Sequence, residues 1–249
     1  MSAAWFAGPP PGPAAEVLLF CLPYAGGGAQ AFRRWPQLLP AAVGVQPVLL
    51  PGRERRILEP ATVDPAAVAD AVQARADRPY AFYGHSMGGR LGLEVTRQLR
   101  SRDATLPVRL AVGGARAPDE VDPFLDIVRL PDDEFVDELV ALGGTPAEAM
   151  ADPELRDLLL PALRADLGWL AETGPPPPDP LPVPVDAYVG DADPLDGPAE
   201  MAGWARQTTA GFRLHEVPGG HFLVHSPPPE LVSRLATDLL AAVRDGVTR

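Results

Sequence analysis

The stretch Tyr80-Ala81-Phe82-Tyr83-Gly84-His85-Ser86-Met87-Gly88 decides which fold is predicted for this chain of 249 residues. Its apolar and aromatic start predicts a buried strand, and Gly-x-Ser-x-Gly directly after a strand is typical of a tight turn into a helix. Such a turn holds its serine at strained backbone angles, and a glycine two residues to either side relieves the crowding. Residues 90–99 then carry apolar side chains without a proline, as expected for a helix packed under a sheet. We therefore expect Ser86 Oγ to project into a cleft and to act as a nucleophile.

A serine hydroxyl is a poor nucleophile near neutral pH, so the chain must also supply a base, and its four histidines are the candidates. His221 follows Val217-Pro218-Gly219-Gly220 and precedes a predicted helix over about 229–243, which places it on a loop that leaves a strand. In α/β-hydrolases the order along the chain is Ser, then acid, then His at this place. His221 is therefore the predicted base.

The other three histidines are predicted to have no catalytic role. His85 lies inside the serine turn, where its side chain is expected to point away from the nucleophile and to pack. His215 belongs to an alternating run and is expected on a solvated strand face. His225 stands four residues after His221, so the two could imitate a pair of metal ligands on one helical face. A proline run blocks a helix there, and no further His, Cys or acidic cluster completes a coordination shell, so no metal is predicted.

The acid that orients the base is expected on the loop after the strand at about 183–190, and this loop carries three aspartates. Asp193 is the first choice, because it lies three residues past the end of the strand and is held by the φ-restricting Pro194. Asp191 is the second choice. Asp196 is the third, and its preferred role is to cap the helix that begins near residue 198.

The N-terminal half supplies a candidate oxyanion hole. Residues 17–22 predict a buried parallel strand, which ends in Pro23-Tyr24-Ala25-Gly26-Gly27-Gly28. Two backbone amides are needed to bind the oxygen that becomes negative during acyl transfer: that of Met87, directly after the nucleophile, and that of Ala25, with Tyr24 as the alternative. The loop is not a phosphate loop, because no Gly-Lys-Ser/Thr follows, and its glycines lack the spacing of a dinucleotide fingerprint.

Four segments, taken in their order, resemble the type II (editing) thioesterases that accompany polyketide and non-ribosomal peptide synthases. They are Leu19-Phe20-Cys21-Leu22-Pro23-Tyr24-Ala25-Gly26-Gly27-Gly28, Phe32-Arg33-Arg34-Trp35, Leu49-Leu50-Pro51-Gly52-Arg53-Glu54-Arg55-Arg56 and Gly84-His85-Ser86-Met87-Gly88-Gly89. The resemblance extends over about residues 18–241. It is specific because a Pro-Gly-Arg-x-x-Arg segment between an oxyanion loop and a serine turn is not a general hydrolase feature.

The resemblance implies the α/β-hydrolase fold, an α/β architecture in which a mostly parallel central sheet is flanked by helices. It also implies hydrolysis of stalled or wrongly primed acyl groups on the phosphopantetheine arm of an acyl or peptidyl carrier protein. Ser86, Asp193 and His221 would be the triad, with Ala25 and Met87 as oxyanion amides, and no cofactor is expected because the pantetheine belongs to the carrier. An acyl-CoA thioesterase or small-molecule carboxylesterase would use the same residues, and a non-enzymatic binding module is the remaining alternative.

The hydrolase domain is predicted to span residues 16–249, with a tail before it and a lid insertion within it. Residues 1–15 hold four prolines and are expected to form a loose, flexible tail. Residues 122–178 are too many for a simple crossover and predict a helical lid, with helices over 132–142 and 153–170. The apolar stripe of the second helix is expected either to pack on the core or to line an acyl chamber. The predicted substrate-binding residues are Tyr24, Trp169 and Leu170.

Composition limits the partners and the location. The formal net charge of −12 argues against a nucleic-acid partner, because phosphate neutralisation dominates such binding. No hydrophobic run reaches membrane-spanning length and the first residues lack a basic n-region, so we expect a cytoplasmic protein that does not enter the membrane. The single cysteine, Cys21, is expected to be a small buried apolar residue.

The net charge also raises a question for the carrier protein, because carrier proteins are commonly acidic and would be repelled unless the contact face is locally basic. Two arginine clusters could provide that face or hold the pantetheine phosphate. The alternative is that they form structural ion pairs with acids such as Glu54 and Glu59. The clusters are Arg33 with Arg34, and Arg53 with Arg55 and Arg56.

Overall fold

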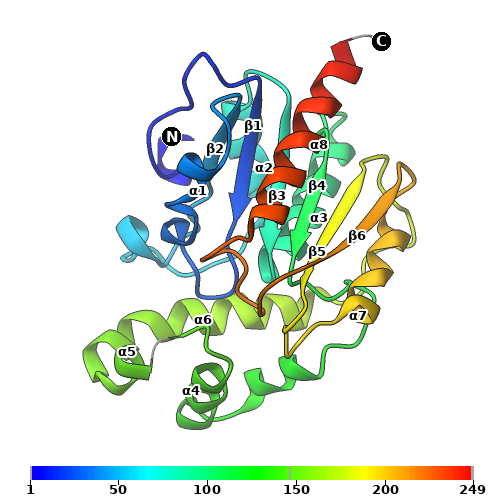
Figure 1. The fold of residues 1–249 in the computed structure, drawn as a ribbon. Coiled ribbons are helices and arrows are strands. Elements are labelled where there is room, and N and C mark those ends of the chain that lie inside the picture. The colour runs from blue at the N-terminus through cyan, green and yellow to red at the C-terminus, as the bar shows by residue number, and fades with distance from the viewer. Residues whose placement is uncertain (1, 146, 248–249) are drawn as a thin grey trace.

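The computed structural model describes residues 2–145 and 147–247, and within them six strands form one sheet (Figure 1). The strands are β1 (Val17–Leu22), β2 (Val43–Pro47), β3 (Tyr80–His85), β4 (Leu110–Gly113), β5 (Val185–Gly190) and β6 (Phe212–Val217). Their order across the sheet is β2-β1-β3-β4-β5-β6, and each neighbouring pair is parallel. The predicted α/β class with a parallel central sheet is confirmed.

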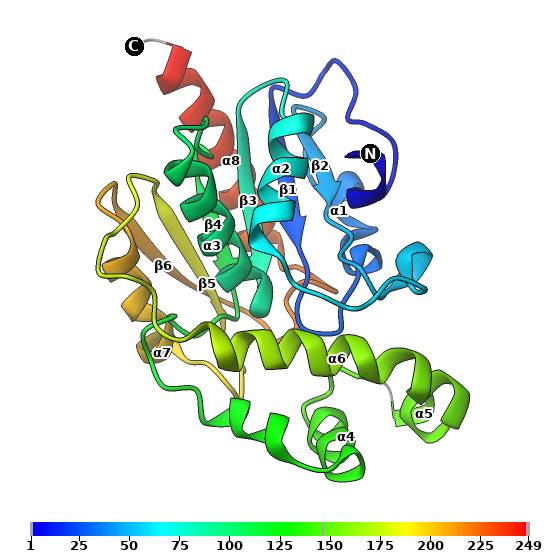
Figure 2. The ribbon, with the colours of Figure 1, turned by 180° about the vertical axis from the view of Figure 1, so that it is seen from behind.

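Helices cover both faces of this sheet, as Figures 1 and 2 show from opposite sides. The helices α2 (Pro65–Arg75) and α3 (Met87–Ser101) lie on one face, and α1 (Trp35–Leu38) and α8 (Pro229–Val247) on the other. Because successive side chains of a strand point to opposite faces, Phe20 joins the core under α3 while the adjacent Leu19 joins the core under α8. Burial on both faces explains why the central strands β1, β3 and β4 are apolar without alternation, whereas β6, at the edge of the sheet, alternates.

The segment between β4 and β5 crosses the carboxyl ends of the strands (Figure 1). It contains η4 (Pro123–Arg129), α4 (Asp132–Ala141), α5 (Ala147–Ala151) and α6 (Pro153–Thr173), so both predicted helices are present. These elements share a small apolar core of their own, separate from the two cores of the sheet: Ile127, Phe135, Val136, Leu139, Met150, Leu163 and Leu167. After β5 follow α7 (Pro198–Ala202) and η5 (Gly203–Gln207).

The N-terminal segment differs from the expected loose tail, because apolar residues hold it against the domain. It starts with η1 (Ser2–Trp5), and Phe6 is buried and bridges to Val48 beside β2. The guanidinium of Arg56 lies 4.3 Å from the ring centre of Trp5. Met1, Pro146, Thr248 and Arg249, which the predicted tail, lid and domain ranges include, lie outside the described residues.

The described residues contain no helix with the length and apolar character needed to cross a membrane.

Candidate active site

Ser86 stands at the sharp turn between β3 and α3, with a φ of 51° and a ψ of −118°. A positive φ is rare and strained for a residue with a side chain, and here the surroundings enforce it. The amide of Ser86 donates to the carbonyl of Gly113 over 2.8 Å, and the carbonyl of Ser86 accepts from the amide of Gly89 over 2.9 Å. A Cβ at Gly84 would collide with the carbonyl of Gly88, and one at Gly88 with the carbonyl of Leu22. The predicted strand-turn-helix around the serine is present.

His221 lies on the loop after β6, and its Nδ1 lies 2.9 Å from Oδ2 of Asp193 on the loop after β5. Oδ1 of the same carboxylate accepts from the amides of Leu195 and Asp196, over 2.8 and 3.1 Å. His221 is 7% exposed, and the Asp193 side chain is fully buried. Asp191 is exposed and its carboxylate accepts from the amide of Gly219 instead. The structure thus brings Asp193, and not Asp191, to the imidazole.

The contacts of Asp193 keep its carboxyl ionised. Burial by itself would raise the pKa of Asp193, but the hydrogen bond and charge of His221, together with the two backbone amides, lower the pKa below its ordinary value. An ionised carboxylate on Nδ1 selects the imidazole tautomer whose Nε2 is free to accept a proton.

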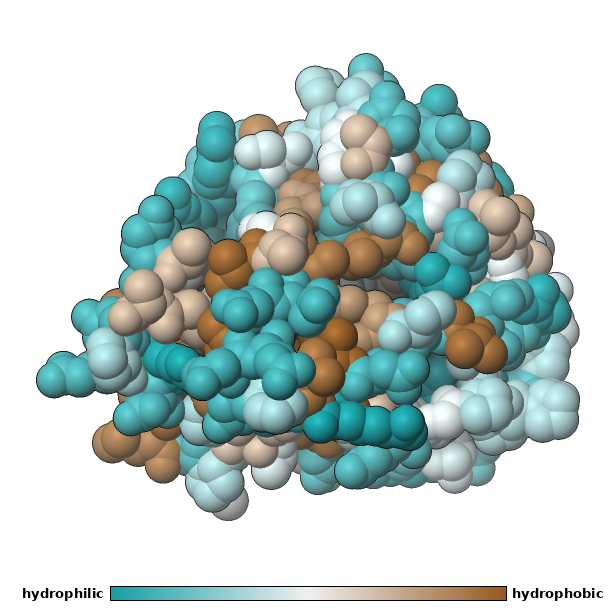
Figure 3. Space-filling view, turned by 90° about the horizontal axis from the view of Figure 1, so that it is seen from below, coloured by the Kyte–Doolittle hydropathy of each residue, from teal (hydrophilic) through white to brown (hydrophobic). Residues whose placement is uncertain are grey.

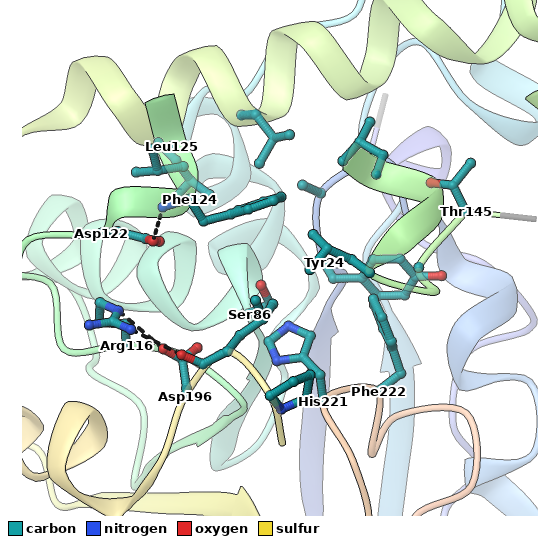
Figure 4. A pocket seen from close by; sticks show the side chains of 18 of the residues that line it. Tyr24, Ser86, Arg116, Asp122, Phe124, Leu125, Thr145, Asp196, His221 and Phe222 are labelled. Carbon is teal, nitrogen blue, oxygen red and sulfur yellow. Dashed lines mark hydrogen bonds and ion pairs between the residues drawn. The ribbon is translucent and has the colours of Figure 1, made fainter. Parts of the chain in front are cut away.

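Asp196 does not have its expected role as a helix cap. Gly197 is the N-cap of α7, and its amide donates to the carboxylate of Glu200 over 2.9 Å. Asp196 is 7% exposed and pairs with Arg116, whose Nε lies 3.2 Å from Oδ1. Burial raises the pKa of Asp196 to about 6, although the charges of His221 and Arg116 oppose the rise. This ion pair borders the cavity beside Ser86 (Figure 4).

The cavity has a volume of about 260 Å³, and Ser86 and His221 both line it (Figure 4). Its walls are mostly apolar and come from the loop after β1, the segment between β4 and β5, and the loop carrying His221. Of the three residues predicted to bind substrate, Tyr24 and Leu170 line the cavity. Trp169, the preceding residue on α6, is not among the lining residues and packs on the sheet core. Neighbouring positions on a helix point about 100° apart, which gives Trp169 and Leu170 different surroundings. The apolar lining residues of the crossing segment are Phe124, Leu125, Leu139, Leu142, Leu163, Leu167 and Leu170.

The amides of Ala25 and Met87 are available for a ligand. Ala25 lines the same cavity as Ser86, and the Met87 amide begins α3, where helical amides lack an intrahelical partner. Within the described residues, neither the Ala25 amide nor the Met87 amide donates a hydrogen bond to a protein acceptor. The amide of Gly26, by contrast, donates to the carboxylate of Asp166 over 2.7 Å.

The remaining histidines contact protein groups. His85 is fully buried, and burial lowers its pKa far below the ordinary value, so its ring is neutral. The Nε2 of His225 lies 3.1 Å from the hydroxyl of Tyr24. His215 is half-buried instead of solvated, because its ring stacks on Tyr188 with centroids 5.0 Å apart.

One group of three potential metal ligands occurs within the described residues: Asp186, His215 and Asp238. Arg213 pairs with both aspartates and Arg109 adds a second cation to Asp186, so these carboxylates are already neutralised by the protein. We therefore treat the group as an ion-pair network.

The second arginine cluster has structural roles. Arg53 is 4% exposed and forms a bidentate ion pair with the fully buried Asp166. Arg56 is 9% exposed and binds Glu59 and the carbonyl of Leu49. Arg53 and Arg56 are therefore not available as a docking face, whereas Arg33 and Arg34 are exposed. The sequence did not reveal Asp166, because it lies within an apolar helical stripe, 113 residues from Arg53.

The family model of the thioesterase domain matches this sequence over residues 18–239, which is most of the chain. The chain belongs to the thioesterase domain family. This thioesterase is 37% identical over 242 residues to the linear gramicidin dehydrogenase LgrE of Brevibacillus parabrevis, with 94% of this chain and 92% of the relative covered. Although that relative is named a dehydrogenase, the glycine-rich loop of the thioesterase lacks dinucleotide spacing.

Two solved structures extend the comparison. RedJ, a thioesterase from the prodiginine biosynthetic pathway in Streptomyces coelicolor, has a TM-score of 0.81 and 39% identity, with 94% of this chain and 90% of RedJ covered. BorB, a type II thioesterase from the borrelidin biosynthetic cluster, has a TM-score of 0.80 and 31% identity, with 94% of this chain and 97% of BorB covered. The resemblance to type II thioesterases is confirmed, and the protein is an enzyme that hydrolyses thioesters.

Proposed function

We propose that this thioesterase removes acyl groups from the phosphopantetheine arm of acyl or peptidyl carrier proteins, through an acyl-serine intermediate. The observation that carries the proposal is the combination of Ser86 on a strained turn with the His221–Asp193 pair, held at 2.9 Å, beside one apolar cavity. Ser86, His221 and Asp193 are the proposed nucleophile, base and orienting acid.

In the first step, His221 Nε2 accepts the hydroxyl proton of Ser86 while Oγ attacks the thioester carbonyl. The carbonyl oxygen becomes negative and is stabilised by the amides of Ala25 and Met87. When the tetrahedral intermediate collapses, the carbon–sulfur bond breaks and the pantetheine sulfur leaves with the proton from His221. The products are an acyl-serine and a free carrier thiol.

In the second step, His221 takes a proton from water, and the resulting nucleophile attacks the acyl-serine. The oxyanion again lies between the two amides, and the proton returns to Ser86 Oγ as the carboxylic acid leaves. Asp193 stays ionised throughout and stabilises the charged imidazole, in agreement with the direction of its pKa shift.

The apolar walls from η4, α4 and α6 are the proposed chamber for the acyl chain, because burial of methylene groups there favours binding. The segment of residues 122–178 would act as a lid over this chamber. The cytoplasm is the proposed location, since the carrier proteins on which the enzyme would act work there.

The test is intact-mass monitoring of a panel of acylated carrier proteins incubated with wild type or with Ser86→Ala. The proposal predicts loss of the acyl mass with wild type only, and a transient acyl adduct on the wild-type enzyme. Acyl-CoA and simple esters of the same acyl groups are the comparison substrates. Faster turnover of acyl-CoA or ester than of acyl carrier would overturn the carrier assignment, and equal activity of Ser86→Ala would overturn the nucleophile.

A further inference from the structure

A buried ion pair lies directly behind the candidate oxyanion loop. Arg53 Nη1 and Nη2 donate to the two carboxylate oxygens of Asp166 over 2.7 and 2.8 Å. Arg53 follows β2, and Asp166 lies in the middle of α6. Both hold the loop: Asp166 Oδ2 accepts from the amide of Gly26 over 2.7 Å, and Arg53 Nη1 donates to the carbonyl of Gly27 over 2.8 Å.

These contacts restrain the peptide groups next to the Ala25 amide. The carbonyl of Tyr24 accepts from the amide of Gly27 over 2.8 Å, and in a planar trans peptide the Ala25 N–H points opposite to that carbonyl. The following peptide is fixed through the Gly26 amide on Asp166, and Gly26 itself has a φ of 74°. The Ala25 N–H is left without a protein acceptor between the bonded carbonyl of Tyr24 and the bonded amide of Gly26, and Ala25 lines the cavity.

Stability alone does not account for such a pair. Taking two charges out of water is unfavourable, and apolar residues of similar volume often stabilise a fold as well as a buried ion pair or better. A bidentate Arg–carboxylate pair does provide fixed directions, because its two hydrogen bonds define one plane. Packing supports the same geometry, since a side chain at Gly26 would collide with Leu163 of α6.

We infer that Asp166 and Arg53 are positioning residues, which hold the loop after β1 so that the Ala25 amide faces the oxyanion. The inference rests on the proposed function and extends it, because it makes α6 of the crossing segment part of the oxyanion hole's support. It also gives the Pro-Gly-Arg segment a role within the enzyme.

The experiment compares wild type with Asp166→Asn and with the double variant Arg53→Met/Asp166→Leu, which removes both charges. It measures kcat and KM on an acyl-pantetheine thioester, and Kd for an acyl trifluoromethyl ketone and for a non-hydrolysable acyl thioether. The ketone forms a tetrahedral adduct with Ser86, and the thioether stays in the ground state. We expect kcat to fall and the ketone Kd to rise on the order of a hundredfold, with KM and the thioether Kd within about threefold of wild type.

Asp186→Asn is the matched control, because Asp186 is also fully buried and also paired with arginine, in its case Arg109 and Arg213, and lies near the amino end of β5, away from the site. We expect it to lower the melting temperature and to leave kcat per folded enzyme unchanged. If Asp166→Asn does not fold, the positioning role is tested on the double variant Arg53→Met/Asp166→Leu. Wild-type kcat in a folded variant, or equal loss of ketone and thioether affinity, overturns the inference. A wild-type enzyme that fails to cleave the thioester or to bind the ketone at Ser86 would instead overturn the proposed function.

Discussion

Single residues at this site take their properties from burial and from the charges next to them. Asp193 and Asp196 lie three positions apart on one loop, and both are buried. The first has hydrogen bonds that favour its charged form, so its pKa is lowered, whereas burial prevails for the second and its pKa is raised to about 6. Two aspartates on one loop therefore have different protonation states near pH 5.

Asp193→Asn tests which carboxylate orients the base. An amide at this position can donate to Nδ1 and would favour the wrong imidazole tautomer, so we expect kcat to fall on the order of 10³- to 10⁴-fold. Asp191→Asn is the control, and its kcat should stay within about twofold of wild type because its carboxylate is exposed. Steady-state kinetics on an acyl thioester measure both. The reverse ranking would show that Asp191 is the catalytic acid.

Asp196→Asn tests the raised pKa through stability. Below pH 3.8 this carboxyl is protonated in both the folded and the unfolded chain. Between pH 3.8 and about 6 the unfolded chain loses the proton first, so the free energy of unfolding falls as the pH rises. Asparagine has a similar shape and no charge, and we expect it to raise the free energy of unfolding at pH 7.5 by about 1 to 3 kcal/mol.

Urea unfolding of wild type and Asp196→Asn at pH 4 and at pH 7.5 provides the measurement. The increase in the free energy of unfolding caused by Asp196→Asn should be small at pH 4, where the wild-type carboxyl is neutral in the folded protein. An equal increase in the free energy of unfolding at both pH values would mean that the protonation of Asp196 does not cause the stabilisation.

At the scale of elements, the segment between β4 and β5 has two parts that differ in their attachment. α6 contacts α3 and is tied to the loop after β1 through Asp166. α4 packs on η4 and α5, within the small separate core. Any opening of the proposed lid should therefore involve α4, with the middle of α6 remaining in place.

Hydrogen exchange followed by mass spectrometry measures this difference. We expect the amides of α4 to exchange at least about tenfold faster than those near the middle of α6, because local opening of α4 breaks fewer buried contacts. A non-hydrolysable acyl thioether should slow exchange in α4, since its chain would pack against Leu139. Equal protection of α4 and α6, unchanged by the thioether, would argue against a moving α4.

At the scale of the whole molecule, a net charge of −12 must be reconciled with the proposed carrier protein, because carrier proteins are commonly acidic. Many of the arginines are engaged in ion pairs, including the buried Arg53 and Arg56. The face that includes the crossing segment shows apolar residues in separate groups between hydrophilic ones (Figure 3). Local charge is therefore the stronger candidate for guiding the carrier. Arg33, Arg34 and Arg55 are the exposed members of the predicted clusters, and Arg55 also donates to the carbonyl of Phe6, so Arg33 and Arg34 are the pair to test first.

Arg33→Glu/Arg34→Glu should raise KM for an acyl carrier protein several-fold, about fivefold at low ionic strength, and the effect should shrink with added salt. KM for an acyl-pantetheine thioester should not change, because that small substrate lacks the carrier surface. Arg100→Glu/Arg102→Glu, at the carboxyl end of α3 and so far from Ser86, controls for the same change in net charge. Equal rises in KM for both substrates would exclude docking by these arginines.

The sequence alone determined the parts that depend on neighbours along the chain. The serine turn, the parallel strands, the helices in the crossing segment and the order Ser, Asp, His follow from local patterns, because glycine spacing and apolar periodicity constrain the backbone wherever they occur. Tyr24 and Leu170, which were predicted to bind substrate, line the cavity.

Only the tertiary structure decided which groups meet across long separations. It directed Asp193 instead of Asp191 to the imidazole, turned Trp169 away from the cavity, and buried Arg53 on Asp166. It also packed the N-terminal segment that its prolines had suggested to be loose. The physical reason is that a difference of one or two positions in a loop or helix changes the direction of a side chain, and only packing against distant segments selects that direction.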